Sequence, residues 1–142
     1  MSLKIQWTIT DGGRKDAFPE SVKKQKQIGD CVIRATAIAT ETPYKEVWQT
    51  LFTKALSMGF FPNNDNVCKA HLMDQGWKEL KFGKKLIRMD DKKIRDLSKD
   101  KWIICYTRSH WVAMKDSTIY DTWQSSLNSM DAYSRVFRVY YK

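Results

Sequence analysis

Residues 29–40 of the chain read GDCVIRATAIAT, and this stretch decides how the N-terminal half folds. Most residues after Asp30 are apolar or small, which predicts a helix buried on most sides rather than a surface helix with one apolar stripe. Asp30 is a favoured N-cap residue and places Cys31 in the first helical turn. Gly29 lets the chain turn closely into the helix. We therefore expect a buried central helix with a thiol at its N-terminal end.

The rest of the sequence predicts helices first and strands afterwards. Periodicity and turn residues indicate a strand at 3–9, a turn at 11–13, an irregular basic segment at 18–29, helices at 42–58, about 66–75 and near 91–98, a short strand near 77–82, a strand at 101–107, a hairpin at 110–123 that turns at 115–117, and a last strand at 134–141. In the 42–58 helix, Thr42 is the expected cap and Pro43 the first helical residue. This order predicts an α+β fold, with N-terminal helices packed on a C-terminal antiparallel sheet, in a single domain covering residues 1–142.

Composition narrows the class of protein. Of the 142 residues, 42% are apolar and 13% aromatic, which is typical of a globular chain. The sequence has no run of about 18 apolar residues that would span a membrane, and its N-terminus is too polar for a signal peptide. The three cysteines form no CxxC pair, and neither histidine has a cysteine ligand close by in sequence. We therefore expect free thiols, a cytoplasmic location and no metal or cofactor.

Positive charge gathers in residues 78–101. The chain has a net charge of +9, and this segment holds ten Lys or Arg against five Asp or Glu. A solvated, solubilising face is the simplest interpretation. The alternative is a surface that binds nucleic acid or an acidic protein partner, although the sequence carries no RNP, zinc-finger or Gly-rich phosphate motif.

Cys31, His110 and Asp121 supply, in chain order, a thiol, an imidazole and a carboxylate. A helix N-terminus favours the thiolate, which is the reactive form, and a nearby imidazolium favours it further. A turn at 115–117 places positions 110–111 opposite 121–122, so Asp121 can orient the His110 ring. Each residue alone also fits a structural role, as a buried cysteine or a satisfied histidine. Together they predict a nucleophile, a base and an orienting carboxylate.

Two further residues complete the predicted site. Gln25 lies six residues before Cys31, and its side-chain amide and the Cys31 backbone N–H would form an oxyanion hole. Gln27 is the alternative donor. Trp123 shares a strand face with Asp121, where its indole would cover the His–Asp contact or simply pack in the core.

The segment around the cysteine resembles the active-site segment of papain-like cysteine peptidases. Its pattern is Gln25-x3-Gly29-x-Cys31, and those enzymes also have a glutamine six residues before the nucleophile and a glycine two before it. Residues 121–123, Asp-Thr-Trp, resemble their Asn-Ser-Trp motif, with Asp in place of Asn. Cys31 and His110 are 79 positions apart, which makes the chain more similar to compact papain-like domains, such as the peptidase domain that removes double-glycine leaders in bacteriocin exporters. As a small standalone domain with a Gly-Asp-Cys start, the chain also resembles bacteriophage-encoded proteins.

The resemblance covers about residues 25–123 through motifs rather than continuous similarity. It implies a papain-like fold and a cysteine peptidase that cleaves a peptide or isopeptide bond of a protein or peptide substrate. The residues implied to act are Cys31, His110, Asp121 and Gln25. Val32 stands where papain-type enzymes often have Trp, and Thr122 where the bacteriocin-processing group has Pro. Substrate preference is therefore not implied.

Two alternatives remain open from the sequence. The same triad supports acyltransferases, including transglutaminase-like enzymes, in which an amine rather than water accepts the acyl group. The other alternative is a non-enzymatic binding protein that uses residues 78–101, with Cys31 as a core residue. The reactivity of Cys31 with iodoacetamide separates the enzymes from the binding protein, because only a low-pKa thiol reacts rapidly at pH 6.

Overall fold

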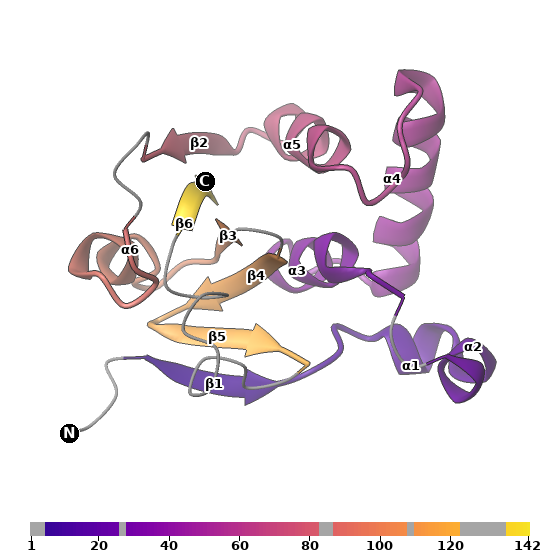
Figure 1. Ribbon diagram of the computed structural model, residues 1–142, viewed down its shortest axis with the longest axis horizontal. Coiled ribbons are helices and arrows are strands. Elements are labelled where there is room, and N and C mark those ends of the chain that lie inside the picture. Colours follow the sequence, from indigo (N-terminus) through magenta and orange to yellow (C-terminus); the bar gives the residue numbers. More distant parts are fainter. Residues whose placement is uncertain (1–4, 26–27, 83–86, 108–109, 123–135) are drawn as a thin grey trace.

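The structure is a computed structural model that describes residues 5–25, 28–82, 87–107, 110–122 and 136–142. These residues form six helices and one six-stranded mixed sheet, so the protein is of the α+β class (Figure 1). The helices are α1 (Arg14–Ala17), α2 (Pro19–Lys24), α3 (Cys31–Ala39), α4 (Tyr44–Met58), α5 (Asp65–Asp74) and α6 (Lys92–Leu97). The strands are β1 (Gln6–Ile9), β2 (Lys78–Lys81), β3 (Ile103–Thr107), β4 (His110–Lys115), β5 (Thr118–Asp121) and β6 (Val136–Tyr141).

The sheet has the strand order β1-β5-β4-β3-β6-β2. Four of its five strand pairs are antiparallel, but β1 runs parallel to β5, with Gln6 opposite Thr118 and Ile9 opposite Asp121. The prediction of a purely antiparallel sheet is therefore wrong at this edge. Alternation in residues 5–9 indicates a strand but carries no information on its direction or its neighbour.

Helix α3 is the central helix of the fold. It packs on β4 and on α4, and six of its nine residues are buried. Ala35, Ala37 and Ala39 have small side chains, so the helix can pack closely against both the sheet and α4. The opposite face of the sheet is covered by α6, which buries Ile94 (Figure 1). The buried helix expected from residues 29–40 is confirmed.

The start of α3 differs in detail from the expected cap. Asp30 occupies the N-cap position, but its side chain makes no capping hydrogen bond. The carboxylate instead binds Arg34 and accepts a hydrogen bond from the Tyr44 hydroxyl at 2.7 Å. Ionic partners therefore outcompete the backbone amides for this buried carboxylate, which is only 2% exposed.

Three other local predictions need correction. The basic segment 18–29 was expected to be irregular, but the whole of α2 lies within it, and α1 precedes it, anchored by the buried Arg14. Helix α4 begins at Tyr44 with Pro43 at the N-cap, and no side chain caps it. The Thr42 hydroxyl donates instead to the Thr40 carbonyl at 3.2 Å. In both segments a side chain hydrogen-bonds to a backbone carbonyl, and a pattern of residue types does not predict which carbonyl accepts.

The remaining predicted elements agree with the structure to within a few residues, for β1 and β6 as far as the described residues extend. The hairpin turn is shorter than expected, because Lys115 pairs with Thr118 and only Asp116 and Ser117 form the turn. Both turn residues have positive φ, 49° and 58°, as a two-residue hairpin turn with the strands' own twist requires. In this register Tyr120 lies opposite Ala113, so Asp121 is not directly opposite positions 110–111 as expected.

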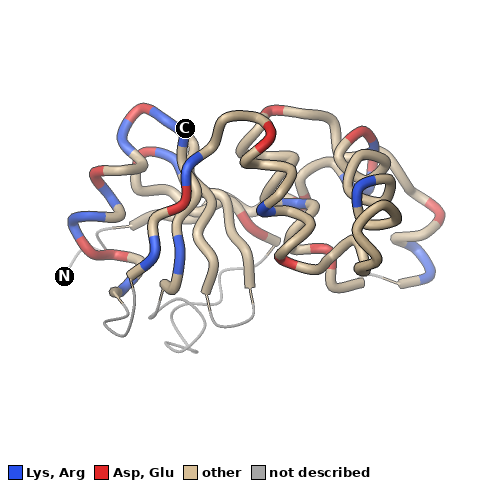
Figure 2. The backbone as a smooth tube through the Cα atoms, turned by 90° about the horizontal axis from the view of Figure 1, so that it is seen from above, with Lys and Arg blue, Asp and Glu red and all other residues tan. Residues whose placement is uncertain are grey.

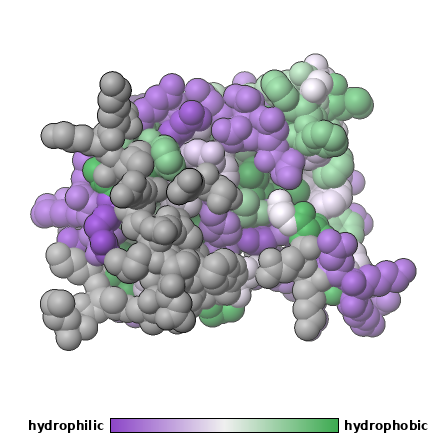
Figure 3. Space-filling view, viewed as in Figure 1, coloured by the Kyte–Doolittle hydropathy of each residue, from purple (hydrophilic) through white to green (hydrophobic). Residues whose placement is uncertain are grey.

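Charge and apolar surface are distributed differently over the molecule. In Figure 2, blue and red segments alternate over α6 and the neighbouring strands, and ion pairs such as Lys92–Asp96 join them. Figure 3 shows apolar atoms gathered over the C-terminal end of α4, where Leu56 is 85% exposed. None of the described helices is long and apolar enough to cross a membrane.

Candidate active site

Three elements bring Cys31, His110 and Asp121 together. Cys31 is the first residue of α3, His110 the first of β4, and Asp121 the last of β5. Helix α3 packs along β4 and also contacts β5, so its N-terminus reaches the ends of both strands. The predicted thiol, imidazole and carboxylate are therefore neighbours in space, although 90 residues of sequence separate the first from the last.

His110 and Asp121 form the closest polar contact of the group. The imidazole Nε2 lies 2.6 Å from the Asp121 Oδ2, and the two side chains are 18% and 3% exposed. The register pairs Ala113 with Tyr120, so Asp121 meets His110 diagonally rather than from the directly opposite position. The contact engages one ring nitrogen and so fixes the orientation of the ring.

The Cys31 thiol has polar partners on the sheet side. Burial of the sulfur opposes ionisation, but the hydrogen bond with His110, the Trp111 backbone N–H and the positive charges of His110 and Arg34 outweigh it. The pKa of Cys31 therefore lies below its usual value. Because Trp111 is in β4 and Cys31 starts α3, the packing of helix on strand supplies this stabilisation.

The pKa of His110 moves in the opposite direction. Burial of the ring lowers it, but the hydrogen bonds to Asp121 and Cys31 and the negative charge of both raise the pKa to about 9. A lowered thiol pKa beside a raised imidazole pKa favours the thiolate–imidazolium pair. This ion pair persists between the pKa of Cys31 and a pH of about 9.

Arg34 joins two buried carboxylates behind this pair. Its Nη1 binds Asp30 Oδ1, and its Nη2 lies 3.4 Å from Asp121 Oδ1, which also accepts the Thr122 backbone N–H at 2.8 Å. One carboxylate oxygen of Asp121 therefore contacts His110, and the other contacts Arg34 and the Thr122 backbone N–H. Sequence reasoning missed Arg34, although Asp30 and Arg34 have the i,i+4 spacing of a helical ion pair.

Gln25 is placed through its backbone. It is the exposed C-cap residue of α2, and its carbonyl accepts a hydrogen bond of 2.7 Å from Arg14 Nη2. The buried Arg14 therefore holds the segment that leads to the start of α3. The role of the Gln25 amide as an oxyanion donor stays a prediction. Gln27 and Trp123 lie outside the described residues.

The other two cysteines have different surroundings. Cys68 and Cys105 are buried, and burial raises the pKa of each thiol to about 12. The Cys68 sulfur lies 3.1 Å from the Thr36 hydroxyl, which only partly offsets its desolvation. Cys31 is the one of the three that is partly exposed and has a lowered pKa.

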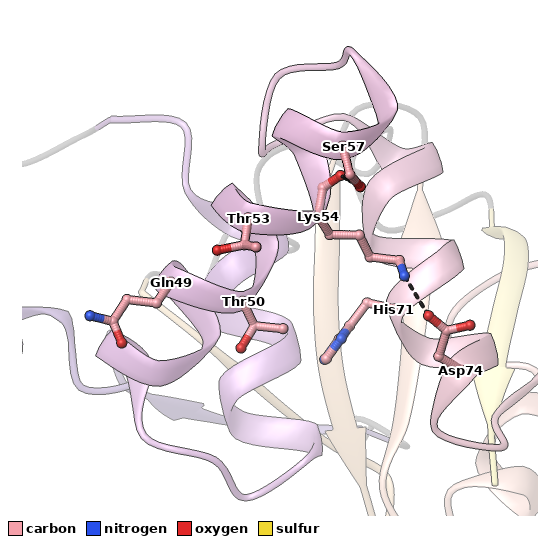
Figure 4. Close-up of a pocket in the computed structure, with 7 residues that line it drawn as sticks. All are labelled: Gln49, Thr50, Thr53, Lys54, Ser57, His71 and Asp74. Atoms are coloured by element: carbon pink, nitrogen blue, oxygen red, sulfur yellow. Dashed lines mark hydrogen bonds and ion pairs between the residues drawn. The ribbon is translucent and has the colours of Figure 1, made fainter.

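The second histidine belongs to a separate polar groove between α4 and α5 (Figure 4). The groove has a volume of about 530 Å³, and His71 lines it together with Lys54 and Asp74, which form an ion pair. Burial and the charge of Lys54 lower the pKa of His71, so its ring is neutral at pH 7. None of the predicted site residues lines this groove.

The sequence also led to expectations about metal binding and about the basic segment 78–101. In the part of the chain that the structure describes, no group of three or more His, Cys, Asp or Glu side chains could hold a metal ion. The segment 78–101 contributes β2 and α6, and acidic partners bind Lys81, Arg88 and Lys92. Residues 83–86 of this segment lie outside the described residues.

Comparison with known proteins gives no match: no family model, no curated protein and no solved structure is similar to this chain. The function is therefore argued from the geometry of the site.

Proposed function

We propose that the protein is a thiol hydrolase that cleaves a peptide or isopeptide bond, with Cys31 as nucleophile and His110 as acid–base. One observation carries the proposal. The Cys31 thiol interacts with the His110 imidazole, and the Nε2 of that ring lies 2.6 Å from the buried Asp121 carboxylate. A nucleophile, a base and a group that orients the base are the three parts that this chemistry needs.

The arrangement of elements supports a papain-like fold. The nucleophile begins a buried helix, further helices pack on one side of it, and the histidine and carboxylate come from adjacent antiparallel strands on the other. The motif around Gln25, Gly29 and Cys31 agrees with the same family. The parallel strand β1 is an addition to the purely antiparallel sheet that the sequence led us to expect.

In the acylation step, the Cys31 thiolate attacks the carbonyl carbon of the scissile bond. A carbon–sulfur bond forms, and the carbonyl π electrons move to the oxygen. The Cys31 backbone N–H at the start of α3 and the Gln25 side-chain amide donate to this oxyanion. When the oxyanion collapses, the carbon–nitrogen bond breaks and the His110 imidazolium gives its proton to the leaving amine.

In the deacylation step, neutral His110 takes a proton from water, and the hydroxide so formed attacks the thioester. The carbon–sulfur bond breaks, the acid is released, and the thiolate returns beside a protonated imidazole. Asp121 stabilises that imidazolium in both halves of the cycle while staying ionised itself. Arg34 helps to keep this carboxylate charged and in place, because it binds the oxygen that His110 does not use.

Ester hydrolysis tests the proposal without knowledge of the natural substrate. We expect p-nitrophenyl acetate to acetylate Cys31 at pH 7, with release of nitrophenolate and slow return of the free enzyme, as followed by absorbance and intact mass. Cys31→Ala should lose both signals. Cys68→Ser is the matched control, because that thiol is also helical but fully buried, and it should retain them.

Two outcomes would redirect the proposal. Acetylation that is equally distributed over the three cysteines, or that survives in Cys31→Ala, would remove Cys31 from the chemistry. If an added amine such as glycine methyl ester captures the acetyl group far more efficiently than water does, the protein is an acyltransferase with the same nucleophile.

A further inference from the structure

An apolar pocket lies beside the N-terminus of α3. Its volume is about 360 Å³, within the range of pockets that hold small ligands. The residues that form it come from the segment before the nucleophile, from α3, and from α4 and the loop after it, and include Ile28, Gly29, Ile33, Trp48, Phe52 and Pro62. It is distinct from the groove around His71, with which it shares no residue.

Aromatic side chains give this pocket a fixed wall. Trp48 and Phe52, one turn apart on α4, are stacked with their ring centroids 4.6 Å apart. Phe18 also packs against Trp48, with the ring centroids 5.2 Å apart, and helps to hold that indole in place. Phe52 remains 42% exposed, so its ring can still bury apolar surface of a ligand.

The described residues that line the pocket offer no unpaired charge. Asp30 is the one ionisable residue among them, and both of its carboxylate oxygens are already bound, one by Arg34 and the other by Tyr44. Ser21 and Asn63 add polar groups to the lining. An uncharged apolar group therefore fits this wall, whereas a charged group would lose hydration and gain no ionic partner.

The pocket also lies close to the reacting atoms. Gly29 lines it and stands two residues before Cys31, so their Cα atoms are at most about 7 Å apart. An extended peptide advances about 3.3 Å per residue. A substrate held at Cys31 therefore reaches the pocket within about three residues of its scissile carbonyl. A Cβ at Gly29 would meet no atom within 4 Å, so the space above this backbone is open.

We propose that this pocket binds an aromatic or branched aliphatic side chain of the peptide that Cys31 attacks, and so selects apolar substrates. The inference rests on the proposed function, since it assigns the pocket to the substrate of that same nucleophile.

The test uses acetyl-dipeptide chloromethyl ketones, which alkylate an active thiolate with loss of chloride. The series varies one of the two dipeptide positions at a time and keeps the other constant. The varied residue is Leu, Phe, Ala, Asp or Lys. The rate of Cys31 alkylation at pH 7 is measured by mass spectrometry and divided by the iodoacetamide rate on the same protein. We expect Leu or Phe to exceed Asp about tenfold or more at one position, as burial of one apolar side chain supplies.

Variants of Phe52 link the preference to the pocket. Phe52→Ala should reduce the Leu-to-Asp ratio about threefold or more without changing the iodoacetamide rate, and Phe52→Lys should shift the ratio toward Asp. Phe61→Ala is the matched control, because this ring is 81% exposed and does not line the pocket. It should leave the ratio unchanged.

The possible failures are distinguishable. A fast iodoacetamide reaction at Cys31 with equal rates for all dipeptides, or an equal loss of preference in Phe52→Ala and Phe61→Ala, overturns the pocket assignment alone. A Cys31 that reacts with iodoacetamide no faster than Cys68 overturns the proposed function, and the pocket assignment with it.

Discussion

Cys31 and Cys68 lie in the same layer of helices, yet their thiols have opposite properties. Burial opposes ionisation of both. At Cys31, a histidine, an arginine and a backbone N–H more than offset that cost, whereas Cys68 has only the hydroxyl of Thr36. The comparison teaches that the partners brought by distant segments, rather than burial or helix membership, decide which thiol can react.

The largest expected effect is the difference in reactivity between these two thiols. At pH 7, a thiol of pKa about 12 is ionised in only about one molecule in 10⁵. Because the pKa of Cys31 is lowered, its thiolate fraction is far larger, so iodoacetamide should label it on the order of 10³-fold faster than Cys68 or Cys105, after allowance for its lower nucleophilicity. Peptide mapping of a time course measures all three rates in one sample, and similar rates would erase the comparison.

Removal of the imidazole should make Cys31 resemble Cys68 more closely. His110→Ala removes the hydrogen bond and the positive charge that favour the thiolate, and it removes the proton donor. We expect ester turnover to fall roughly 10³-fold, within the range of general acid–base effects. The rate of Cys31 alkylation by iodoacetamide should also rise only at a higher pH than in the native protein, because the pKa of the thiol increases. His71→Ala is the matched control, since that ring lines a different groove, and it should retain turnover.

Gln25 tests whether the site has an oxyanion donor as well as an ion pair. Gln25→Ala should lower kcat about 10²-fold if its amide donates to the oxyanion. The iodoacetamide rate should not change, because alkylation develops no oxyanion. An unchanged kcat would move the role to another donor, for which Gln27→Ala is the next variant.

The carboxylate should matter less than the imidazole. Asp121→Asn keeps a hydrogen-bonding group against His110 but removes the negative charge, so we expect a loss of about tenfold near neutral pH. The pKa of His110, about 9 in the native protein, should fall. The alkaline limb of the pH–rate profile should therefore move to lower pH, and NMR titration of the ring would show the same shift. A limb that stays near pH 9 would contradict the role given to Asp121.

Substitution of Arg34 should have the smallest effect on the maximal rate and a specific effect on the pH dependence of turnover. Arg34→Gln removes a positive charge that lowers the pKa of Cys31, so the acid limb should move to higher pH. We expect turnover about threefold to tenfold lower on the acid limb of the profile and nearly normal at the pH optimum. Arg34→Lys should largely preserve the limb. Lys54→Gln, which breaks an ion pair elsewhere, should leave both limbs in place.

Sequence patterns predicted the elements of this fold better than their pairing. The apolar run after Asp30 identifies α3 because a helix buried on most sides has a composition that local sequence records. The shift of the hairpin register and the parallel pairing of β1 were not predicted, because both depend on contacts between segments far apart in the chain. The short helices α1 and α2 were missed for a related reason, since the buried Arg14 stabilises that segment through the Gln25 carbonyl.

The candidate site divides in the same way. Cys31, His110 and Asp121 could be chosen from residue type, order and predicted element, and the structure brings all three together. Arg34 was not chosen, although its spacing from Asp30 was visible in the sequence. Its importance comes from Asp121, 87 residues away, with which it forms an ion pair.

By itself, the sequence of this protein determined the types and order of its elements, apart from α1 and α2, and the chemical groups at a candidate site. Only the tertiary structure decided which thiol has a lowered pKa, which carboxylate faces the imidazole and where an apolar pocket adjoins the nucleophile. The physical reason is that periodicity and turn preference are local properties, whereas a pKa depends on burial and on charges within a few ångströms. In this chain, those charges come from α3, β4 and β5, which meet only when the protein folds.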